Sequence, residues 1–243
     1  MIKVTYIDHM GSDLTVVNSA RVSFGKKSQL VEGGIKQDEQ GDYLEMVLSD
    51  RDTKLIRYLA KHKHISPFGH AFASFHVKAP VFVARQLVKH KFLRWNEISR
   101  RYVDEEPEFY EPKTWRGRAK DKKQGSEGVV DLSSILDTEH NTAILGSGTL
   151  EGHVIEISEW LRETYKLLLD KGVCPEQARM VLPQSTMTEW YWSGSLDAFA
   201  DMCNLRCASD TQAETREVAT QISRRMRSLF PVSWEALVEK SNE

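Results

Sequence analysis

Residues 85–102 hold the densest set of groups that could do chemistry in this chain. The segment contains six Arg or Lys residues and a single acid, together with His90, Ser99 and the aromatic residues Trp95 and Tyr102. Guanidinium groups bind phosphate in a bidentate manner, and Lys binds it as a point charge. The composition therefore predicts a binding site for an anionic ligand, above all a nucleotide.

The same segment could instead be a solvated basic face, or a patch that contacts nucleic acid through interleaved basic and aromatic residues. Two observations favour a specific site. The segment continues directly from the apolar run 79–84, and hence from buried structure. The whole chain has 33 Lys and Arg against 35 Asp and Glu, a net charge of −2, so the positive charge is concentrated here.

The elements that must position these groups can be predicted from periodicity and from turn and cap residues. Strands are expected over 2–7, 71–78 and 185–192. Helices are expected over 13–24 with Asp13 as cap, 50–62 capped by Ser49 or Asp50, 81–88, 151–171 ended by Gly172, and 211–230. A short helix should follow Pro175, and Ser195 should cap a helix that includes Arg206. The polar residues 25–41 are expected to form a loop. This order predicts an α/β fold of the α+β type, with helices around a central, mainly antiparallel sheet.

Composition limits the remaining possibilities. The chain has 243 residues, long enough for one large domain or two small ones, and 40% of them are hydrophobic, enough for a core. It has no apolar run near the roughly 18–20 residues of a membrane span, and its first residues are typical of a strand rather than a signal peptide. Cys174, Cys203 and Cys207 have no metal-ligand spacing. We expect a cytoplasmic protein in a reduced compartment, without a membrane or nucleic-acid partner.

Five blocks of the sequence resemble the flavin-dependent thymidylate synthases. That family is marked by Arg-His-Arg, seven residues and a Ser followed closely by Arg and Tyr. Here Lys89-His90-Lys91 is followed by seven residues, Ser99, two Arg and Tyr102, so Lys replaces both outer Arg. Four further blocks match in the family's order: Ala20-Arg-Val-Ser-Phe24, the His-rich 62–70, 172–183, and Asn204-Leu-Arg206 with Gln212 and Glu214.

The resemblance implies a single domain over 1–243 that converts dUMP to dTMP. It implies bound FAD, NADPH as reductant and 5,10-methylenetetrahydrofolate as carbon donor. It also implies a homotetramer whose active sites are built from several subunits. Residues 111–150 lose apolar periodicity, and we interpret them as a loop insertion rather than a second domain.

By resemblance, the catalytic residue is Arg206, which would contact the pyrimidine edge and favour ionisation at N3. The alternative for Arg206 is a surface ion pair with Asp201 or Glu214. The dUMP site would comprise Gln86, Lys89, Glu97, Ser99, Arg100, Arg101, Arg179 and Arg206. The FAD site would comprise His64, Ser66, Lys89, His90, Lys91, Glu97, Ser195 and Asp201.

Residue types support flavin chemistry over two other mechanisms. A thiol nucleophile in a Pro-Cys-His context is absent, because Cys174 precedes Pro175 and no His follows. A reduced flavin needs no thiol. Ser99 lacks an inferable base and orienting acid, so we assign it to substrate binding. The three His of 62–70 lack an acid or Cys at metal-ligand spacing, and we expect no metal.

The chain departs from the family pattern at four positions near the expected flavin. Lys89 and Lys91 lack the fork geometry of Arg, and Asp197 and Asp201 add negative charge where relatives often carry Arg, Asn or His. These differences leave open a related flavoenzyme that modifies another pyrimidine nucleotide, such as a hydroxymethylating enzyme acting on dCMP.

Overall fold

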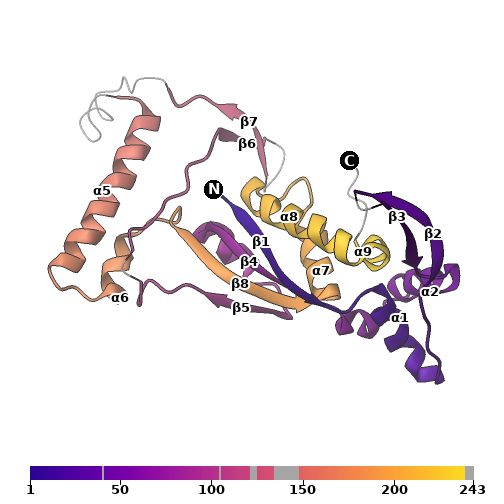
Figure 1. Cartoon of the computed structure of the whole chain (residues 1–243). Coiled ribbons are helices and arrows are strands. Elements are labelled where there is room, and N and C mark those ends of the chain that lie inside the picture. The colour runs from indigo at the N-terminus through magenta and orange to yellow at the C-terminus, as the bar shows by residue number, and fades with distance from the viewer. Residues whose placement is uncertain (40, 104, 121–124, 134–147, 239–243) are drawn as a thin grey trace.

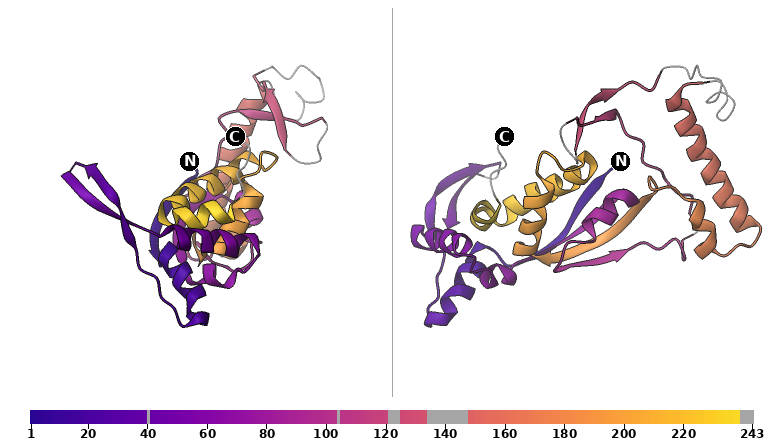
Figure 2. Two further views of the ribbon diagram at one scale, coloured as in Figure 1. Left: turned by 90° about the vertical axis from the view of Figure 1, so that its right-hand side faces the viewer. Right: turned by 180° about the vertical axis from the view of Figure 1, so that it is seen from behind.

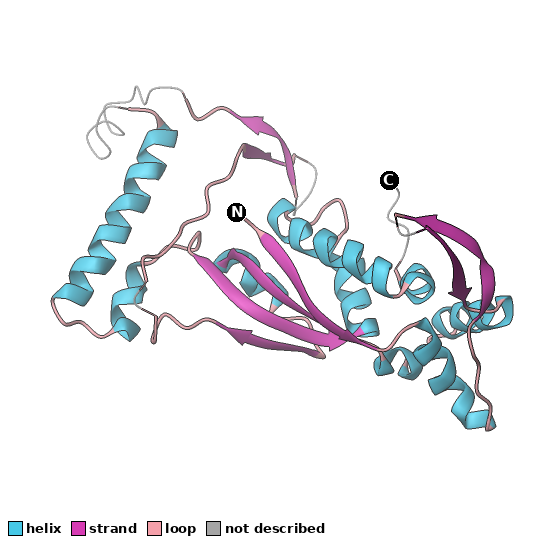
Figure 3. Cartoon of the chain, viewed as in Figure 1, coloured by secondary structure: helices cyan, strands magenta, loops and turns pink. Residues whose placement is uncertain are grey.

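The computed structural model describes residues 1–39, 41–103, 105–120, 125–133 and 148–238. Its centre is a four-stranded sheet in the order β1–β4–β8–β5, in which every neighbouring pair is antiparallel (Figures 1 and 3). The strands are β1 (Lys3–Met10), β4 (Phe72–Pro80), β5 (Leu93–Glu97) and β8 (Met187–Ser195). The α+β fold and the three predicted strands are confirmed, with shifted ends. Strand β5 was not predicted and lies inside the basic segment 85–102.

The two faces of this sheet differ in polarity. Along β4, Phe75 and Val77 are fully buried, whereas the alternating residues are partly exposed. On the second face, the hydroxyl groups of Ser74 and Ser193 lie 2.8 Å apart across β4 and β8. Such alternation is typical of an antiparallel sheet that packs its helices on one face.

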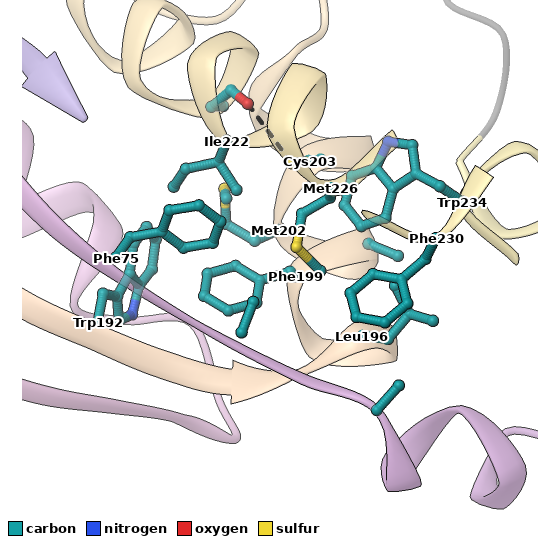
Figure 4. Close-up of a cluster of buried hydrophobic side chains, with 14 of the residues drawn as sticks. Phe75, Trp192, Leu196, Phe199, Met202, Cys203, Ile222, Met226, Phe230 and Trp234 are labelled. Carbon is teal, nitrogen blue, oxygen red and sulfur yellow. Dashed lines mark hydrogen bonds between the residues drawn. The ribbon is translucent and has the colours of Figure 1, made fainter. Parts of the chain in front are cut away.

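Helices α3 (Val81–Leu87), α7 (Leu196–Arg206) and α8 (Ala213–Leu229) pack on the buried face, and α9 (Pro231–Leu237) packs against α7 and α8. Figure 4 shows the aromatic centre of this core, where Phe199 meets Phe75 edge-on with ring centroids 5.3 Å apart, and meets Trp192 at 5.7 Å. The predicted helices α7 and α8 are confirmed, with Ser195 at the N-cap of α7. Helix α9 was not predicted, and its Trp234 is completely buried in the same core.

The N-terminal helix α1 (Asp13–Arg21) continues into a 3-10 turn, η1 (Val22–Phe24). The prediction that Asp13 caps this helix is wrong, because Ser12 occupies the N-cap. Instead the Asp13 carboxylate accepts hydrogen bonds from the backbone N–H groups of Val232 and Ser233, both at 2.9 Å. These are unpaired donors at the start of α9, so Asp13 joins the two ends of the chain.

Helix α2 (Asp50–Lys61) is capped by Ser49, as predicted, and its first turn contains a buried carboxylate. Asp52, 3% exposed, accepts hydrogen bonds from Arg21 Nε at 3.0 Å, Ser28 Oγ at 2.9 Å and Ser49 Oγ at 2.8 Å. Burial raises the pKa of Asp52, but the hydrogen bonds from Arg21, Ser49 and Ser28 outweigh it, and the net pKa lies below its usual value. Asp52 thereby fixes the chain after α1 against α2.

Two hairpins lie where we expected loops. Strands β2 (Val31–Asp38) and β3 (Gly41–Val47) form the first, so the predicted loop over 25–41 is wrong for residues 31–38. Every residue of β2 is exposed. Without a buried face, no apolar alternation marks the strand in the sequence.

The second hairpin, β6 (Trp115–Arg118) and β7 (Ser126–Val130), lies within 111–150. The loop prediction is therefore wrong for these strands, while residues 121–124 and 134–147 of that segment lie outside the described residues. Arg116 Nε donates to Ser126 Oγ at 3.0 Å across the pair. Strand β6 alternates partly buried and exposed residues over only four positions, too short a run for a periodicity argument.

Helix α5 (Leu150–Asp170) is confirmed and ends before Gly172, whose φ of 81° is that of a C′ glycine. The short helix α6 (Pro175–Ala178) is also confirmed, and it continues into η3 (Arg179–Val181). Figures 1 and 2 place α5 at one end of the molecule and the β2–β3 hairpin at the other. Within the described ranges, no helix is long and apolar enough to cross a membrane.

The buried Asp52 predicts an acid-dependent stability. Because its folded pKa is lowered, its contribution is complete above the usual Asp pKa of about 4 and is lost as pH falls through the folded value. Asp52→Asn should lower the free energy of unfolding by about 3 kcal/mol at pH 7, since it leaves Arg21 without its carboxylate.

This difference should shrink below about pH 4 in urea titrations. The matched control is Asp50→Asn, an exposed carboxylate in the same helical turn, which should change stability by less than about 1 kcal/mol. An equal, pH-independent loss in both variants would contradict the role of Asp52.

Candidate functional site

A cavity of about 830 Å³ lies between the C-terminal ends of α3 and α7, the start of α8, the β6–β7 hairpin and one face of α5. Gln86 of α3 and Arg206 of α7 are both part of its wall. The volume is within the usual range of small-molecule sites, roughly 300–1,000 Å³. The structure therefore brings together two residues that lie 120 positions apart and that resemblance assigned to the dUMP site.

Arg206 is the last residue of α7, and its guanidinium is held by two neutral acceptors. Nε donates to His90 Nε2 at 3.0 Å, and Nη2 donates to the Gln86 carbonyl oxygen at 3.3 Å. The expected alternative, an ion pair with Asp201 or Glu214, is not found among the described residues. Burial lowers the pKa of Arg206, yet a guanidinium remains charged at neutral pH.

His90 is neutral in this arrangement. Burial, and secondly the positive charge of Arg206, lower the pKa of His90 to about 4. Because Nε2 accepts the Arg206 hydrogen bond, the ring proton must lie on Nδ1. His90 thus orients the candidate catalytic Arg206. It contacts Arg206, which resemblance assigned to the dUMP site, whereas resemblance assigned His90 to the FAD site.

The Gln86 side chain is held on both atoms of its amide. Nε2 donates to Gln212 Oε1 at 2.5 Å, and Oε1 accepts from Thr215 Oγ1 at 3.2 Å. Gln212 is the N-cap of α8, and Thr215 lies fully buried in its first turn. The start of α8 therefore determines how Gln86 faces the cavity.

The remaining basic segment forms separate local contacts outside this cavity wall. Glu97 on β5 accepts from Thr188 Oγ1 at 2.6 Å and from Trp95 Nε1 at 3.0 Å. Ser99 Oγ accepts from Arg101 Nε at 3.1 Å. Arg100 donates to the backbone carbonyl of Glu105. Ser99 and Arg101 therefore contact each other, but within one chain neither lies in the cavity wall that contains Gln86 and Arg206.

Three further predicted residues are exposed and also lie outside this wall. Lys89 and Lys91 flank His90 on the turn between α3 and β5. Arg179 begins η3 beside α5 and donates within its own turn, to the Glu176 carbonyl at 3.4 Å. The dUMP residues of the sequence prediction are thus dispersed over several surfaces of one chain.

The predicted flavin residues outside the basic segment lie around the end of α2 and along α7. His64 follows α2, Ser66 begins the 3-10 turn η2 (Ser66–His70), and Ser195 is the buried N-cap of α7. Burial and the charge of Asp197 raise the pKa of Asp201, whereas the charge of Lys63 opposes that shift.

Asp197 has a distinctive carboxylate in this region. Its Oδ1 atom is buried and has no hydrogen-bond partner among the described residues. Buried polar atoms are normally paired, so this oxygen is an available acceptor for a ligand N–H or O–H group.

Two residues of the cavity wall have contacts that the sequence analysis did not anticipate. Glu214, 4% exposed, accepts from Arg116 Nη2 on β6 at 2.7 Å and 2.8 Å through its two oxygens. Tyr110 donates weakly to the same carboxylate at 3.4 Å. The sequence analysis named Glu214 in a family block and as a possible partner of Arg206, but no periodicity in 111–150 marks Arg116.

Comparison with known proteins identifies the family of this chain. The family model described as thymidylate synthase complementing protein matches residues 5–232. A flavin-dependent thymidylate synthase of Thermus thermophilus is 38% identical over 97% of this chain and 75% of its own length. The enzyme of the same name from Kosmotoga olearia is 36% identical over 97% of this chain and 89% of its own.

Solved structures share the fold of this chain. The UMP/dUMP methylase PolB from Streptomyces cacaoi, bound with 5-Br dUMP, superposes with a TM-score of 0.75 at 30% identity, over 97% of this chain and 94% of that chain. A second structure of PolB, bound with 5-Br UMP, gives a TM-score of 0.74 at 29% identity. The shared fold extends over the elements that carry Gln86, His90 and Arg206. The chain belongs to the thymidylate synthase complementing protein family, the family of the flavin-dependent thymidylate synthases.

Proposed function

We propose that this protein is a flavin-dependent thymidylate synthase that methylates dUMP at C5 to give dTMP. The carbon donor is 5,10-methylenetetrahydrofolate, the reductant is NADPH, and FAD is the bound cofactor. Family membership supports this reaction class. It also favours a nucleotide substrate over the nucleic-acid alternative for residues 85–102.

The proposal rests mainly on the charge of Arg206 and on the groups to which it is hydrogen-bonded. Its charge faces a cavity of mononucleotide size while its own partners, His90 and the Gln86 carbonyl, are neutral. A half-buried cation with only neutral partners attracts a ligand that carries or develops negative charge. A uracil ring that loses its N3 proton is such a ligand, and a fixed guanidinium stabilises that charge.

Different residues of the chain would bind different parts of the substrate. Arg206 would bind the pyrimidine edge, and His90 would keep its guanidinium in one orientation without competing for its charge. Gln86 would supply an amide to the nucleotide. Ser99, Arg100, Arg101 and Arg179, with Lys89, would bind the phosphate and the remaining nucleotide through charge-assisted hydrogen bonds.

The residues expected to hold FAD are chemically suited to it. The unpartnered Oδ1 of Asp197 fits an N–H or O–H donor, both of which FAD carries. Lys89, Lys91, His64 and Ser66 are exposed donors for its phosphates, and Lys63 lies where it offsets the charge of Asp201. Glu97, His90 and Ser195 complete the set. When bound, the flavin supplies the hydride that reduces the one-carbon unit.

Self-association as a homotetramer would explain two features of the fold. Helix α5 has 21 residues, of which only His153 and Tyr165 are buried, and Trp160 is 80% exposed. The β2–β3 hairpin likewise exposes Ile35, Tyr43 and Leu44. Apolar surface of this extent marks interaction sites. In one chain Arg179 lies outside the wall that contains Arg206, as expected if the active sites are built from several subunits.

Absorption spectroscopy tests the proposed reaction. Purified protein loaded with FAD should show a flavin band that NADPH bleaches faster when dUMP is present. With methylenetetrahydrofolate added, dTMP should accumulate. Protein that binds neither FAD nor dUMP under any condition would contradict the proposal.

A second candidate substrate is UMP, because the structural neighbour PolB is named a UMP/dUMP methylase. Turnover on dUMP, UMP and dCMP, measured side by side at equal concentration, separates the alternatives. We expect dUMP to give the highest kcat/KM. Preference for UMP would assign the chain to ribonucleotide methylation, and preference for dCMP to the hydroxymethylating alternative.

Shared active sites predict complementation between two inactive variants. Arg206→Ala and Arg179→Ala should each lose most activity while keeping the fold, because both side chains lie on the surface of the chain or of its cavity. Mixed oligomers, formed by refolding the two variants together, should regain activity, since some sites would contain both arginines. The control is each variant refolded alone, and no recovery in the mixture would contradict sites shared between subunits.

The neutral His90 predicts an unusual titration. Burial and Arg206 lower its pKa to about 4, so between pH 6.5 and 4 the unfolded chain binds a proton that the folded chain does not. Its contribution therefore reduces stability as pH falls through this range. NMR titration of the ring, assigned with His90→Gln, should give a midpoint of about 4, and a midpoint near 6.5 would contradict this environment.

A further inference from the structure

Glu97 is the last residue of strand β5, and neutral donors hold both oxygens of its carboxylate. Oε1 accepts from Thr188 Oγ1 at 2.6 Å, and Oε2 accepts from Trp95 Nε1 at 3.0 Å. Glu97 is the only acid of the basic segment 85–102, yet none of the described Arg and Lys residues forms an ion pair with it. The residue is exposed. An ionised carboxylate has about four acceptor sites, so about two stay open to a ligand.

The pairing of β5 with β8 places the two donors beside this carboxylate. Glu97 lies opposite Trp190 in the antiparallel pair, and Trp95 lies opposite Trp192. Residues opposite each other share one face of a sheet, as do residues two apart along a strand. Thr188, two residues before Trp190, is therefore a diagonal neighbour of Glu97 on the face that carries the helices.

Aromatic contacts hold the Trp95 ring in one orientation. The ring stacks on Trp190 with centroids 4.3 Å apart and planes at 18°, and it meets Trp192 edge-on at 5.7 Å. Both of these partners are only 1% exposed. Turning the indole would break both contacts, so the core sets the direction of its N–H group. Thr188 is buried as well, and the core thereby determines where the Glu97 carboxylate lies.

An oriented carboxylate selects ligand groups by charge and by hydrogen-bonding role. It repels a phosphate group, and it accepts hydrogen bonds from O–H or N–H donors. The ring N–H groups of uracil and flavin and the sugar hydroxyls are neutral donors of this kind. A binding group holds such a ligand in a fixed direction when packing and hydrogen bonds lock its own rotamer.

We propose that Trp95 and Thr188 are positioning residues that hold the Glu97 carboxylate as an oriented acceptor for a neutral O–H or N–H group of dUMP or of FAD. This inference rests on the proposed function, because resemblance assigns Glu97 to both ligands. Trp95 and Thr188 act through Glu97 rather than on a ligand. Without either hydrogen bond the carboxylate would gain rotamers, and binding would have to order it again.

The test is a pair of dissociation constants. That of FAD is measured by quenching of flavin fluorescence on protein freed of FAD, and that of dUMP by calorimetry on FAD-loaded protein. Trp95→Phe keeps an aromatic ring on Trp190 and removes the N–H group, and Thr188→Val keeps the shape and removes the hydroxyl. Each should weaken the ligand that donates to Glu97 by about fivefold, the usual effect of losing one hydrogen bond. If that ligand is dUMP, KM should rise and kcat at saturation should be retained.

Double variants show whether both residues act through the carboxylate. Glu97→Gln should weaken binding by about tenfold, because the charge of the acceptor is lost. Adding Trp95→Phe or Thr188→Val to Glu97→Gln should cost less than about a further twofold, since the group that they orient is gone.

Two further variants separate positioning from a general effect on the fold. Thr188→Ser keeps the hydroxyl and should retain most of the affinity. Trp190→Phe shortens the same stack as Trp95→Phe, but it removes an N–H group that has no hydrogen-bond partner among the described residues. It should bind both ligands like the wild type. If Trp95→Phe does not fold, Thr188→Val carries the test.

If Glu97 merely pairs two donors of the core, the single variants would lower stability and leave both dissociation constants unchanged, and the inference would be overturned. Full additivity with Glu97→Gln, or an equal loss in Trp190→Phe, would also overturn it. A wild-type protein that binds neither FAD nor dUMP would instead overturn the proposed function. Weaker FAD binding in Trp95→Phe and Thr188→Val identifies the flavin as the donor, and weaker dUMP binding alone identifies the nucleotide.

Discussion

The candidate site depends on how two arginines and one buried acid are paired. Glu214 lies in the wall of the cavity that Arg206 faces, and it is one of the two acids, with Asp201, that the sequence offered as partners for Arg206. In the structure both carboxylate oxygens of Glu214 accept hydrogen bonds from Arg116, and Arg206 donates to His90 and a backbone carbonyl. A charge without a counter-charge is costly in a folded protein unless a ligand compensates it, and we propose that a nucleotide anion does so here.

The fold provides this arrangement by fixing three helix ends over one sheet. The core of α7 and α8 against β4 and β8 is aromatic and fully buried around Phe199. It sets the end of α7, and with it Arg206, against the end of α3. The first turn of α8 supplies Gln212, Glu214 and Thr215 to the same place. The hairpin β6–β7 adds Arg116 and Ser126 to the cavity wall, and the Arg116 side chain forms an ion pair with Glu214.

Much of the core architecture could be predicted from the sequence, because burial leaves a periodic signal. Strand β4 alternates buried and partly exposed residues, and helix α5 ends at a glycine. The sequence analysis located both elements within a few residues. The exposed β2–β3 hairpin and the four-residue β6 leave no such signal. Asp13 was recognised as a capping residue, but no local pattern shows that it caps α9 at the other end of the chain.

The site was predictable only in part, for a similar reason. Residue types and family resemblance selected Gln86, His90 and Arg206, which the structure brings together. They could not show that His90 faces Arg206 as a neutral acceptor, because its pKa depends on burial by distant elements. Residue types and resemblance also could not identify Arg116, because its partner Glu214 lies 98 residues further along the chain. The dispersal of Ser99, Arg101 and Arg179 over one chain is likewise a property of the three-dimensional arrangement.

The most direct test of this account is the affinity of Arg206→Lys for dUMP, compared with the wild type by calorimetry at pH 7.5. Lys keeps the charge but cannot donate to His90, to the Gln86 carbonyl and to a ligand in one fixed plane. If the oriented guanidinium of Arg206 binds the pyrimidine, the variant should fold normally and bind dUMP at least about tenfold more weakly. Unchanged affinity in a folded Arg206→Lys protein would contradict the assignment of this cavity as the nucleotide site.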